Sequence, residues 1–262
     1  MTFDISKFGF GITGHVPLEV VRELAPIVEQ AGFNTLWFNH TRKGNAYAAI
    51  EVAAAVTDSI RLATGVTSID DFMNTLNVIE EVRSRDLPAD RLTIGIGANK
   101  PPSPLRTIHE SIELLHEELP GVPVVVGALG PKMRAIGVQQ ADGILLNWLT
   151  PEAAAAAVAD RKRDAPDTDA RVALYIRCAF GQENHEAIQK EAARYESFPS
   201  YAANFKRLGF GAMDAAVCVD SPVDLQDRLA RYQDVVDAPV LRAITAEDSV
   251  QAYASLVEAA LN

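Results

Sequence analysis

Short apolar segments alternate with longer amphipathic segments along the whole chain. Eight of the short segments predict strands, because each is a nearly continuous apolar run, as expected for strands covered on both faces. They are residues 8–12, 35–38, 61–66, 92–96, 123–126, 143–147, 172–179 and 240–243. A strand followed by a helix, repeated eight times, predicts an α/β fold of the (β/α)8 TIM-barrel type.

The segments between these strands carry apolar residues at helical spacing. The first helix repeats them every three or four positions over residues 18–28, and the fourth does so over residues 108–119. Gly32 follows the first helix, where a glycine commonly ends one. Thr150 precedes Pro151 and Glu152, and this order is typical of a helix N-terminus.

The longest irregular tract covers residues 198–220 and is rich in Pro, Ser, Tyr, Phe and Gly. We expect a loop or a broken helix there, which could act as a lid. Residues 41–46, 70–77 and 198–213 supply the variable loops from which we expect a substrate pocket to be built. The identity of the substrate is left open by these loops.

Length and composition fit one barrel. The chain has 262 residues, close to the roughly 250 that this fold needs, so we predict a single domain over residues 1–262. No run approaches the roughly 18 apolar residues of a membrane span, and the first residues lack the pattern of a signal peptide. The prediction is a cytoplasmic protein with no membrane partner.

Charge and cysteine content narrow the function classes. A formal charge of −11 argues against non-specific binding to nucleic acid or anionic membranes. Cys178 and Cys218 lie far apart and predict buried thiols in a reducing compartment rather than a disulfide. The five histidines are scattered, so we expect no metal site.

In a parallel barrel the active site lies at the C-terminal ends of the strands. The residues at these positions form a coherent set of small and polar side chains. They are Thr13, Gly14 and His15 after the first strand, Asn39 and His40 after the second, Thr67 and Ser68 after the third, Gly97, Ala98 and Asn99 after the fourth, Asn147 and Trp148 after the sixth, and Arg177 in the seventh.

The turn after the fifth strand has the composition of an anion site. It reads Gly127, Ala128, Leu129, Gly130, Pro131 and Lys132. Two glycines allow a close approach of backbone to a ligand, and the positive end of the following helix favours a phosphate, to which the lysine adds charge. The alternative is a strand-to-helix turn whose glycines only satisfy backbone geometry.

Three side chains at the predicted mouth have a functional and a structural interpretation. His40 titrates near neutral pH and is the candidate for proton transfer, or it is a histidine bonded at a strand end. Trp148 packs over a planar ring or closes the barrel mouth. Arg177 holds a ligand anion or pairs with a core carboxylate such as Glu51.

The stretch GALGPKMRAIGVQQADGILLNWLTPE, at residues 127–152, resembles the bacterial-luciferase-like flavin oxidoreductases. It is most similar to their branch that uses the deazaflavin coenzyme F420 and includes methylenetetrahydromethanopterin reductase. The resemblance continues through EQAGFNTLWFNH, IRLATGV, RLTIGIGAN and RVALYIRCAFG, in the same order along most of the chain.

This resemblance implies a luciferase-like barrel, usually a homodimer, with a flavin or deazaflavin ring in the barrel mouth. The family's phosphate region matches Gly127 to Lys132, together with Asn147 and Trp148. A non-prolyl cis peptide, common in the family behind the ring, maps onto Gly65 and Val66. Several deazaflavin enzymes carry Asp-His after the second strand, where this chain has Asn39-His40.

The chain also departs from the family pattern. Asn39 replaces the usual acid, Asn99 stands where some sugar-phosphate dehydrogenases carry a glutamate, and residues 70–91 lack an Arg-His-Pro signature. The insertions are shortened, so we expect a cofactor site that is more open or is covered by a partner subunit.

The prediction is therefore an F420-dependent oxidoreductase that moves hydride between the deazaflavin C5 and a small organic substrate. The protein contributes positioning and electrostatics, with His40 as the proton-transferring residue. One alternative keeps the fold but uses FMN, as a monooxygenase or a reductase. A second alternative is a cofactor-binding barrel without turnover.

Overall fold

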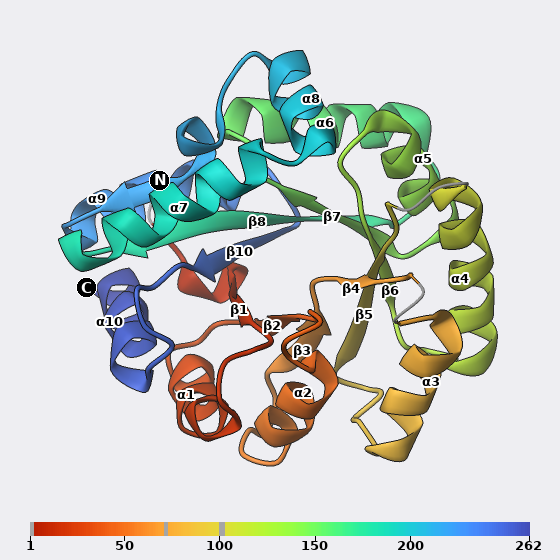
Figure 1. Ribbon diagram of the computed structural model, residues 1–262, viewed down its shortest axis with the longest axis horizontal. Helices are drawn as coiled ribbons and strands as arrows, with labels where there is room; N and C mark the ends of the chain where they lie inside the picture. Colours follow the sequence, from red (N-terminus) through yellow and green to blue (C-terminus); the bar gives the residue numbers. More distant parts are fainter. Residues whose placement is uncertain (1–2, 71–72, 100–102) are drawn as a thin grey trace.

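Parallel strands close into a barrel at the centre of the molecule (Figure 1). The computed structural model describes residues 3–70, 73–99 and 103–262. Within them the strands follow the order β10-β1-β2-β3-β5-β6-β7-β8, and β8 pairs with β10 to close the ring. The strands are β1 (Gly9–Thr13), β2 (Thr35–Asn39), β3 (Arg61–Thr64), β5 (Leu92–Gly97), β6 (Val124–Gly127), β7 (Gly143–Asn147), β8 (Arg171–Phe180) and β10 (Ala238–Ala243).

Two shorter strands extend this barrel. β4 (Thr67–Ser68) continues the direction of β3 after a break at Gly65 and Val66, and it pairs with β5. β9 (Val217–Val219) pairs with the C-terminal end of β8. The resulting sheet is entirely parallel, so all barrel strands point their C-terminal ends to one face.

The helices form a ring around the barrel (Figure 1). They are α1 (Leu18–Gln30), α2 (Ala46–Ala54), α3 (Thr75–Ser84), α4 (Pro104–Glu118), α5 (Pro131–Gln140), α6 (Pro151–Asp164), α7 (His185–Glu196), α8 (Pro199–Leu208), α9 (Pro222–Gln233) and α10 (Val250–Leu261), with the 3-10 turns η1 (Ile5–Lys7), η2 (Gln182–Asn184) and η3 (Ala212–Ala215). None of the helices in the described ranges is long and apolar enough to cross a membrane.

Apolar side chains fill three separate regions. The largest cluster lies between the strands and the surrounding helices. A second cluster packs around Trp148, Ile188 and Phe205, under α7 and α8. The third fills the barrel itself, with Trp37 and Tyr175 as its largest members. Successive strand residues point to opposite faces, so the large and the third cluster are the two sides of the same strands.

The predicted (β/α)8 barrel is confirmed, and each of the eight predicted strands overlaps an observed one. The predicted helix signals also hold. Thr150 accepts a hydrogen bond from the backbone of Ala153 at the start of α6, and Gly32 follows α1 with a φ of 90°. The apolar positions of α1 are buried at Val21 and Val28 but not at Leu18, which is 40% exposed.

The tract at residues 198–220 is more regular than predicted. It contains the intact helix α8, η3 and the strand β9 in place of a loop or broken helix. Pro199 fits the first turn of α8, where its missing N–H costs nothing, so the proline that suggested a loop begins a helix. Cys218 on β9 is half-buried rather than buried, whereas Cys178 is buried as expected, and both thiols are free.

Candidate functional site

Two cavities open side by side at the C-terminal ends of the barrel strands. The first has a volume of about 590 Å³ and is here named the glycine cavity, because Gly65, Gly97, Gly127 and Gly130 line it. The second, of about 580 Å³, is named the arginine cavity, because Arg42, Arg177, Arg194 and Arg242 line it. Asn39 and Tyr195 belong to both.

The glycine cavity gathers most of the residues predicted to bind a cofactor. Its lining includes Asn39, Gly65, Val66, Gly97, Ala98, Asn99, Gly127, Ala128, Leu129, Gly130 and Asn147. These residues follow β2, β3, β5, β6 and β7, as expected for a site at the ends of parallel strands. Pro131, Lys132, Trp148 and Arg177 were predicted with them but do not line this cavity.

The break after β3 forms one wall of the glycine cavity. The Gly65–Val66 peptide bond is cis, at the position to which the family feature maps. A Cβ at Gly65 would overlap the hydroxyl of Tyr175 and lie 2.9 Å from the indole ring of Trp37. Only glycine fits between these two rings.

Asn39 connects this wall to Arg242 on β10 through two hydrogen bonds. Its Nδ2 donates a hydrogen bond to the carbonyl of Gly65, and its Oδ1 accepts one from Nε of Arg242 at 3.1 Å. An ionised aspartate, the usual family residue, has no donor for the Gly65 carbonyl. The carboxamide at position 39 therefore matches both of its partners.

The turn after β6 leads directly into α5. Gly130 is the N-cap residue and Pro131 is the first residue of the helix. A Cβ at Gly130 would meet no heavy atom of the described residues within 4 Å, so the backbone here leaves room for a ligand. Lys132 is exposed on the first turn of α5. The free N–H groups and positive end of α5 face the glycine cavity, where they favour an anion.

Residues of α8 complete this end of the cavity, and the sequence analysis missed them. Ser200, Asn204 and Arg207 line it, at positions i, i+4 and i+7 of one helix face. The Arg207 guanidinium donates to Oδ1 of Asn204 at 2.6 Å, while Nδ2 of Asn204, a residue only 5% exposed, has no partner in the described part of the chain. The helical spacing of these polar residues was a signal in the sequence, hidden by the expectation of a loop.

A further arginine adds positive charge beside α8. Arg134 on α5 is half-buried, and its buried Nε finds no hydrogen-bond partner among the described residues. Burial first, and then the charge of Arg207, lower the pKa of Arg134. Two cations thus lie close to the anion-favouring end of α5.

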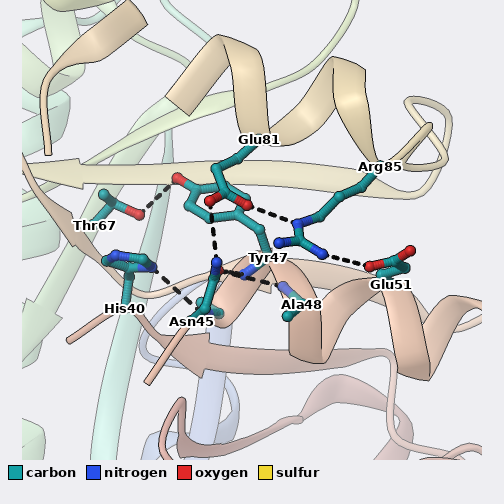
Figure 2. Close-up of polar contacts among 9 residues, drawn as sticks. His40, Asn45, Tyr47, Ala48, Glu51, Thr67, Glu81 and Arg85 are labelled. Atoms are coloured by element: carbon teal, nitrogen blue, oxygen red, sulfur yellow. Dashed lines mark hydrogen bonds and ion pairs between the residues drawn. The ribbon is translucent and has the colours of Figure 1, made fainter. Parts of the chain in front are cut away.

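His40 lines neither cavity, but it lies between Asn39, which lines both, and Thr41, which lines the arginine cavity. Its Nδ1 accepts a hydrogen bond of 3.4 Å from the backbone N–H of Ala46, as Figure 2 shows. The neutral ring therefore carries its proton on Nε2, which is buried and has no partner within the described ranges. Burial lowers the pKa of His40, and Glu81 partly opposes this.

A polar network holds the surroundings of His40 (Figure 2). Tyr47, whose ring centroid lies 5.5 Å from that of His40, shares a 2.7 Å hydrogen bond with Thr67. Asn45 caps α2 and also donates to Glu81 at 3.1 Å. Glu81 is in turn paired with Arg85 at 2.7 Å. These contacts fix the loop that carries the histidine.

Arg177 lies among aromatic rings and does not pair with Glu51. Its guanidinium is 4.7 Å from the ring centroids of both Trp148 and Tyr195, and it donates to Oδ1 of Asn147. Glu51, the example given for a carboxylate partner, pairs instead with Arg85 at 2.6 Å, and the carboxylate near Arg177 is that of Glu191 at 3.8 Å. Trp148 is 1% exposed and does not line the glycine cavity.

The arginine cavity contains a second buried arginine that sequence analysis missed. Arg242 lies in β10, directly beside Arg177 in β8 in the register of the parallel pair. Gly11 on β1 leaves room for it, since a Cβ there would be 3.1 Å from the Arg242 Cδ. His15 also lines this cavity, and its Nε2 is 3.3 Å from a carboxylate oxygen of Asp248.

A closed parallel barrel with cavities at the C-terminal ends of its strands defines the (β/α)8 class, in which this face carries ligand sites. Residues 100–259 match the family model described as luciferase-like monooxygenase. The chain therefore belongs to the luciferase-like family.

Individual relatives are distant. The chain is 23% identical over 213 residues to the 5,10-methylenetetrahydromethanopterin reductase of Archaeoglobus fulgidus, covering 65% of this chain and 64% of that protein's length. An F420-dependent secondary alcohol dehydrogenase, solved with an F420-acetone adduct, superposes with a TM-score of 0.75 at 13% identity, covering 99% of both chains.

A flavin enzyme has a similar fold. The oxygenating constituent of 3,6-diketocamphane monooxygenase from Pseudomonas putida, a type II Baeyer–Villiger monooxygenase solved with FMN, superposes with a TM-score of 0.70 at 13% identity, covering 96% of both chains. At such identities the two structural matches establish the fold.

Proposed function

We propose that this protein is an F420-dependent oxidoreductase that moves hydride between the deazaflavin C5 and a small organic substrate. The observation that carries the proposal is the glycine cavity, whose backbone-lined wall and anion-favouring end suit a planar ring with a phosphate-bearing side chain. The named activities of the A. fulgidus relative and of the F420-dependent dehydrogenase support the choice of cofactor.

The residues present fit such a cofactor. Two of the lining residues carry a buried polar atom that has no partner among the described residues, the hydroxyl of Tyr175 and Nδ2 of Asn204. Buried polar groups in native proteins are nearly always bonded, so unpartnered ones at a cavity indicate a ligand that completes them. The open backbone at Gly130 leaves the space that a phosphate requires.

We assign a holding role to each end of the glycine cavity. The backbone of Gly127 to Gly130, the start of α5, Asn204 and Arg207 would hold the phosphate, with Pro131 and Lys132 shaping and charging the turn. Asn39, Gly65, Val66, Gly97, Ala98 and Asn99 would line the ring, and Asn147 would close its edge. Trp148 and Arg177 support this edge from below, since Arg177 donates to Asn147.

His40 is proposed as the residue that transfers the proton accompanying the hydride. A bound deazaflavin supplies two-electron hydride chemistry at its C5. The lowered pKa keeps His40 neutral at neutral pH, with its proton on the unpartnered Nε2. A buried N–H without an acceptor has no competing bond to break, so it is suited to donate to a bound ligand.

The first experiment is a titration of the purified protein with coenzyme F420 and, separately, with FMN, followed by ring fluorescence. We expect tighter binding of F420. Tighter binding of FMN would transfer the assignment to the flavin branch, and binding of neither would refute the cofactor proposal.

The FMN alternative rests on the FMN-bound P. putida structure and on the name of the matched family. FMN supports oxygen chemistry, to which the deazaflavin is poorly suited. Oxygen consumption by the reduced, FMN-loaded protein in the presence of substrate would favour a monooxygenase. F420-dependent turnover without oxygen uptake would favour the reductase.

A His40→Ala variant separates an enzyme from a barrel that only binds its cofactor. We expect F420 binding to be retained and turnover to fall by about two orders of magnitude or more. Unchanged turnover would remove His40 from the mechanism. Absence of turnover in the parent protein with all tested substrates, despite tight binding, would favour the binding-only alternative.

We also propose a homodimer in the cytoplasm, in line with the family resemblance and the two free thiols. Sedimentation at micromolar concentration tests the dimer. A single species of 28.3 kDa would refute it.

A further inference from the structure

Two arginine side chains lie next to each other inside the barrel, at the arginine cavity. Arg177 on β8 and Arg242 on β10 are paired in the strand register and are only 1% and 7% exposed. Both line the cavity. Like charges at neighbouring strand positions repel each other, and removing each from water is costly. An opposite charge between them would relieve both costs.

Protein groups supply only part of that opposite charge. Glu191 lies 3.8 Å from Arg177, but its other oxygen is paired with Arg194 at 2.8 Å. Arg242 bonds to neutral oxygens, those of the Asn39 side chain and the Ala243 backbone. Within the described residues, Arg242 has no carboxylate ion pair, and Nε of Arg177 is buried without a partner.

The electrostatics of Arg242 agree with this geometry. Its pKa is lowered, first by burial and then by the charge of Arg177. Tyr175, Glu191 and Tyr253 act in the opposite direction. These influences are those expected for a cation that lacks a counter-charge in the ligand-free protein.

We infer that the arginine cavity binds the carboxylate of an organic-acid substrate, held between Arg177 and Arg242. The planar guanidinium fork matches a carboxylate in geometry as well as charge. The carboxylate nearest to this pair is that of Glu191, which is shared with Arg194, so the two buried guanidinium groups keep an excess of positive charge. A carboxylate brings one negative charge on two coplanar oxygens, one for each arginine.

The position of this cavity connects the anion site to the proposed reaction, and the inference rests on the proposed function in this respect. The arginine and glycine cavities share Asn39 and Tyr195, so they adjoin each other. An acid anchored by its carboxylate in the first would extend its remaining carbon atoms toward a ring in the second. The anchor would thereby orient the reacting carbon.

The test compares three probes of similar shape, benzoate, benzamide and phenyl phosphate. Their binding to the unmodified protein is measured by calorimetry, with and without coenzyme F420. We expect benzoate to bind about tenfold or more tightly than benzamide, and more tightly than phenyl phosphate. Equal affinities for benzoate and benzamide would overturn the anion site, and a preference for phenyl phosphate would overturn the carboxylate assignment.

An Arg242→Met variant tests the residue. Methionine is apolar and of similar length, so the fold tolerates it and circular dichroism should be unchanged. Benzoate affinity should fall by about tenfold or more, and this loss should exceed any loss of F420 affinity, which can arise only through the bond between Arg242 and Asn39. Arg231→Met, on the outer helix α9, is the matched control and should bind benzoate like the parent.

Benzoate affinity that is unchanged in Arg242→Met would overturn the assignment. If the variant does not fold, the comparison of benzoate with benzamide on the unmodified protein still decides the inference. Failure of F420 to bind the parent protein would refute the proposed function alone, because the probes report on the anion site without cofactor.

Discussion

The glycine cavity and the arginine cavity are nearly equal in volume and share two lining residues, yet they are built differently. The glycine cavity is lined largely by backbone and small side chains at the ends of β3, β5 and β6. The arginine cavity is formed by long charged side chains from β8, β10 and the loop after β2. The first can recognise a ligand by shape and N–H groups, whereas the second depends on charge.

The two cavities therefore place different requirements on the residues that line them. A site made from backbone requires residues without side chains at fixed points, so its weakness is steric. A site made from buried guanidinium groups requires a compensating anion, so its weakness is electrostatic. Substitutions should therefore affect the two cavities through different observables, and four predictions test this.

The largest effect is expected at Gly65. Gly65→Ala places a Cβ against Tyr175 and Trp37, and we expect the free energy of unfolding to fall by about 1–3 kcal/mol. Urea denaturation measures this change. Gly130→Ala is the matched control from the same cavity, with no described heavy atom within 4 Å of its Cβ, and should cost less than about 1 kcal/mol.

A double variant shows whether the Tyr175 hydroxyl causes the Gly65 effect. Adding Tyr175→Phe to Gly65→Ala removes the overlapping oxygen and should restore part of the lost stability. If Gly65→Ala and Gly130→Ala lower the free energy of unfolding by the same amount, the steric account of this cavity is wrong.

The next effect concerns Arg207, the charged side chain at the anion end of the glycine cavity. Arg207→Gln should weaken binding of a phosphate-bearing cofactor by about tenfold, because a charge-assisted hydrogen bond is lost. Fluorescence titration measures the dissociation constant. Arg231→Gln lines neither cavity and should leave it unchanged. Equal constants for the two variants would exclude Arg207 from the phosphate site.

Two tyrosine hydroxyls give a smaller contrast. Tyr175→Phe removes a buried hydroxyl that has no partner in the described ranges and should change stability by less than about 0.5 kcal/mol or raise it. Tyr47→Phe removes a buried 2.7 Å hydrogen bond to Thr67 and should cost about 1 kcal/mol. Thermal and urea denaturation compare the pair. The reverse order would show that the Tyr175 hydroxyl is bonded in solution.

The smallest effect is a pH dependence at His40, which lines neither cavity but adjoins Asn39, a residue of both. Burial lowers its folded-state pKa, so below the unfolded value of about 6.5 the unfolded chain binds more protons. The free energy of unfolding should therefore fall as the pH drops from about 7 to 5. His40→Gln should flatten this decline in denaturation curves at several pH values. Parallel curves for parent and variant would contradict a depressed pKa.

The fold was largely predictable because its signals are local. The eight barrel strands are short apolar runs, and the period of their helices is visible within a dozen residues. β9 was missed because it has three residues and pairs only with the end of β8. α8 was missed because Pro199, Ser200 and Gly209 resemble a loop, although proline starts this helix and Gly209 ends it with a φ of 81°.

The two cavities also differ in how far the sequence could predict them. The strand-end rule identified the glycine cavity, since the residues it named there end their own strand or come shortly after it. Arg242 was missed because its significance depends on standing beside Arg177, 65 positions earlier, and only the register of β8 and β10 brings them together. The carboxylate near Arg177, which is Glu191 and not Glu51, could not be identified for the same reason, because only the folded arrangement brings the two side chains together.

Asn39 has a consequence for the order in which ligands bind. One half of its carboxamide holds the Gly65 carbonyl and the other half holds the Arg242 guanidinium, so the amide cannot rotate without breaking both bonds. A ligand that draws Arg242 away from Asn39 also loosens the wall of the neighbouring cavity. Binding in one cavity thus changes the affinity of the other cavity for its ligand. Thermodynamic linkage requires that the two ligands change each other's affinity by the same factor.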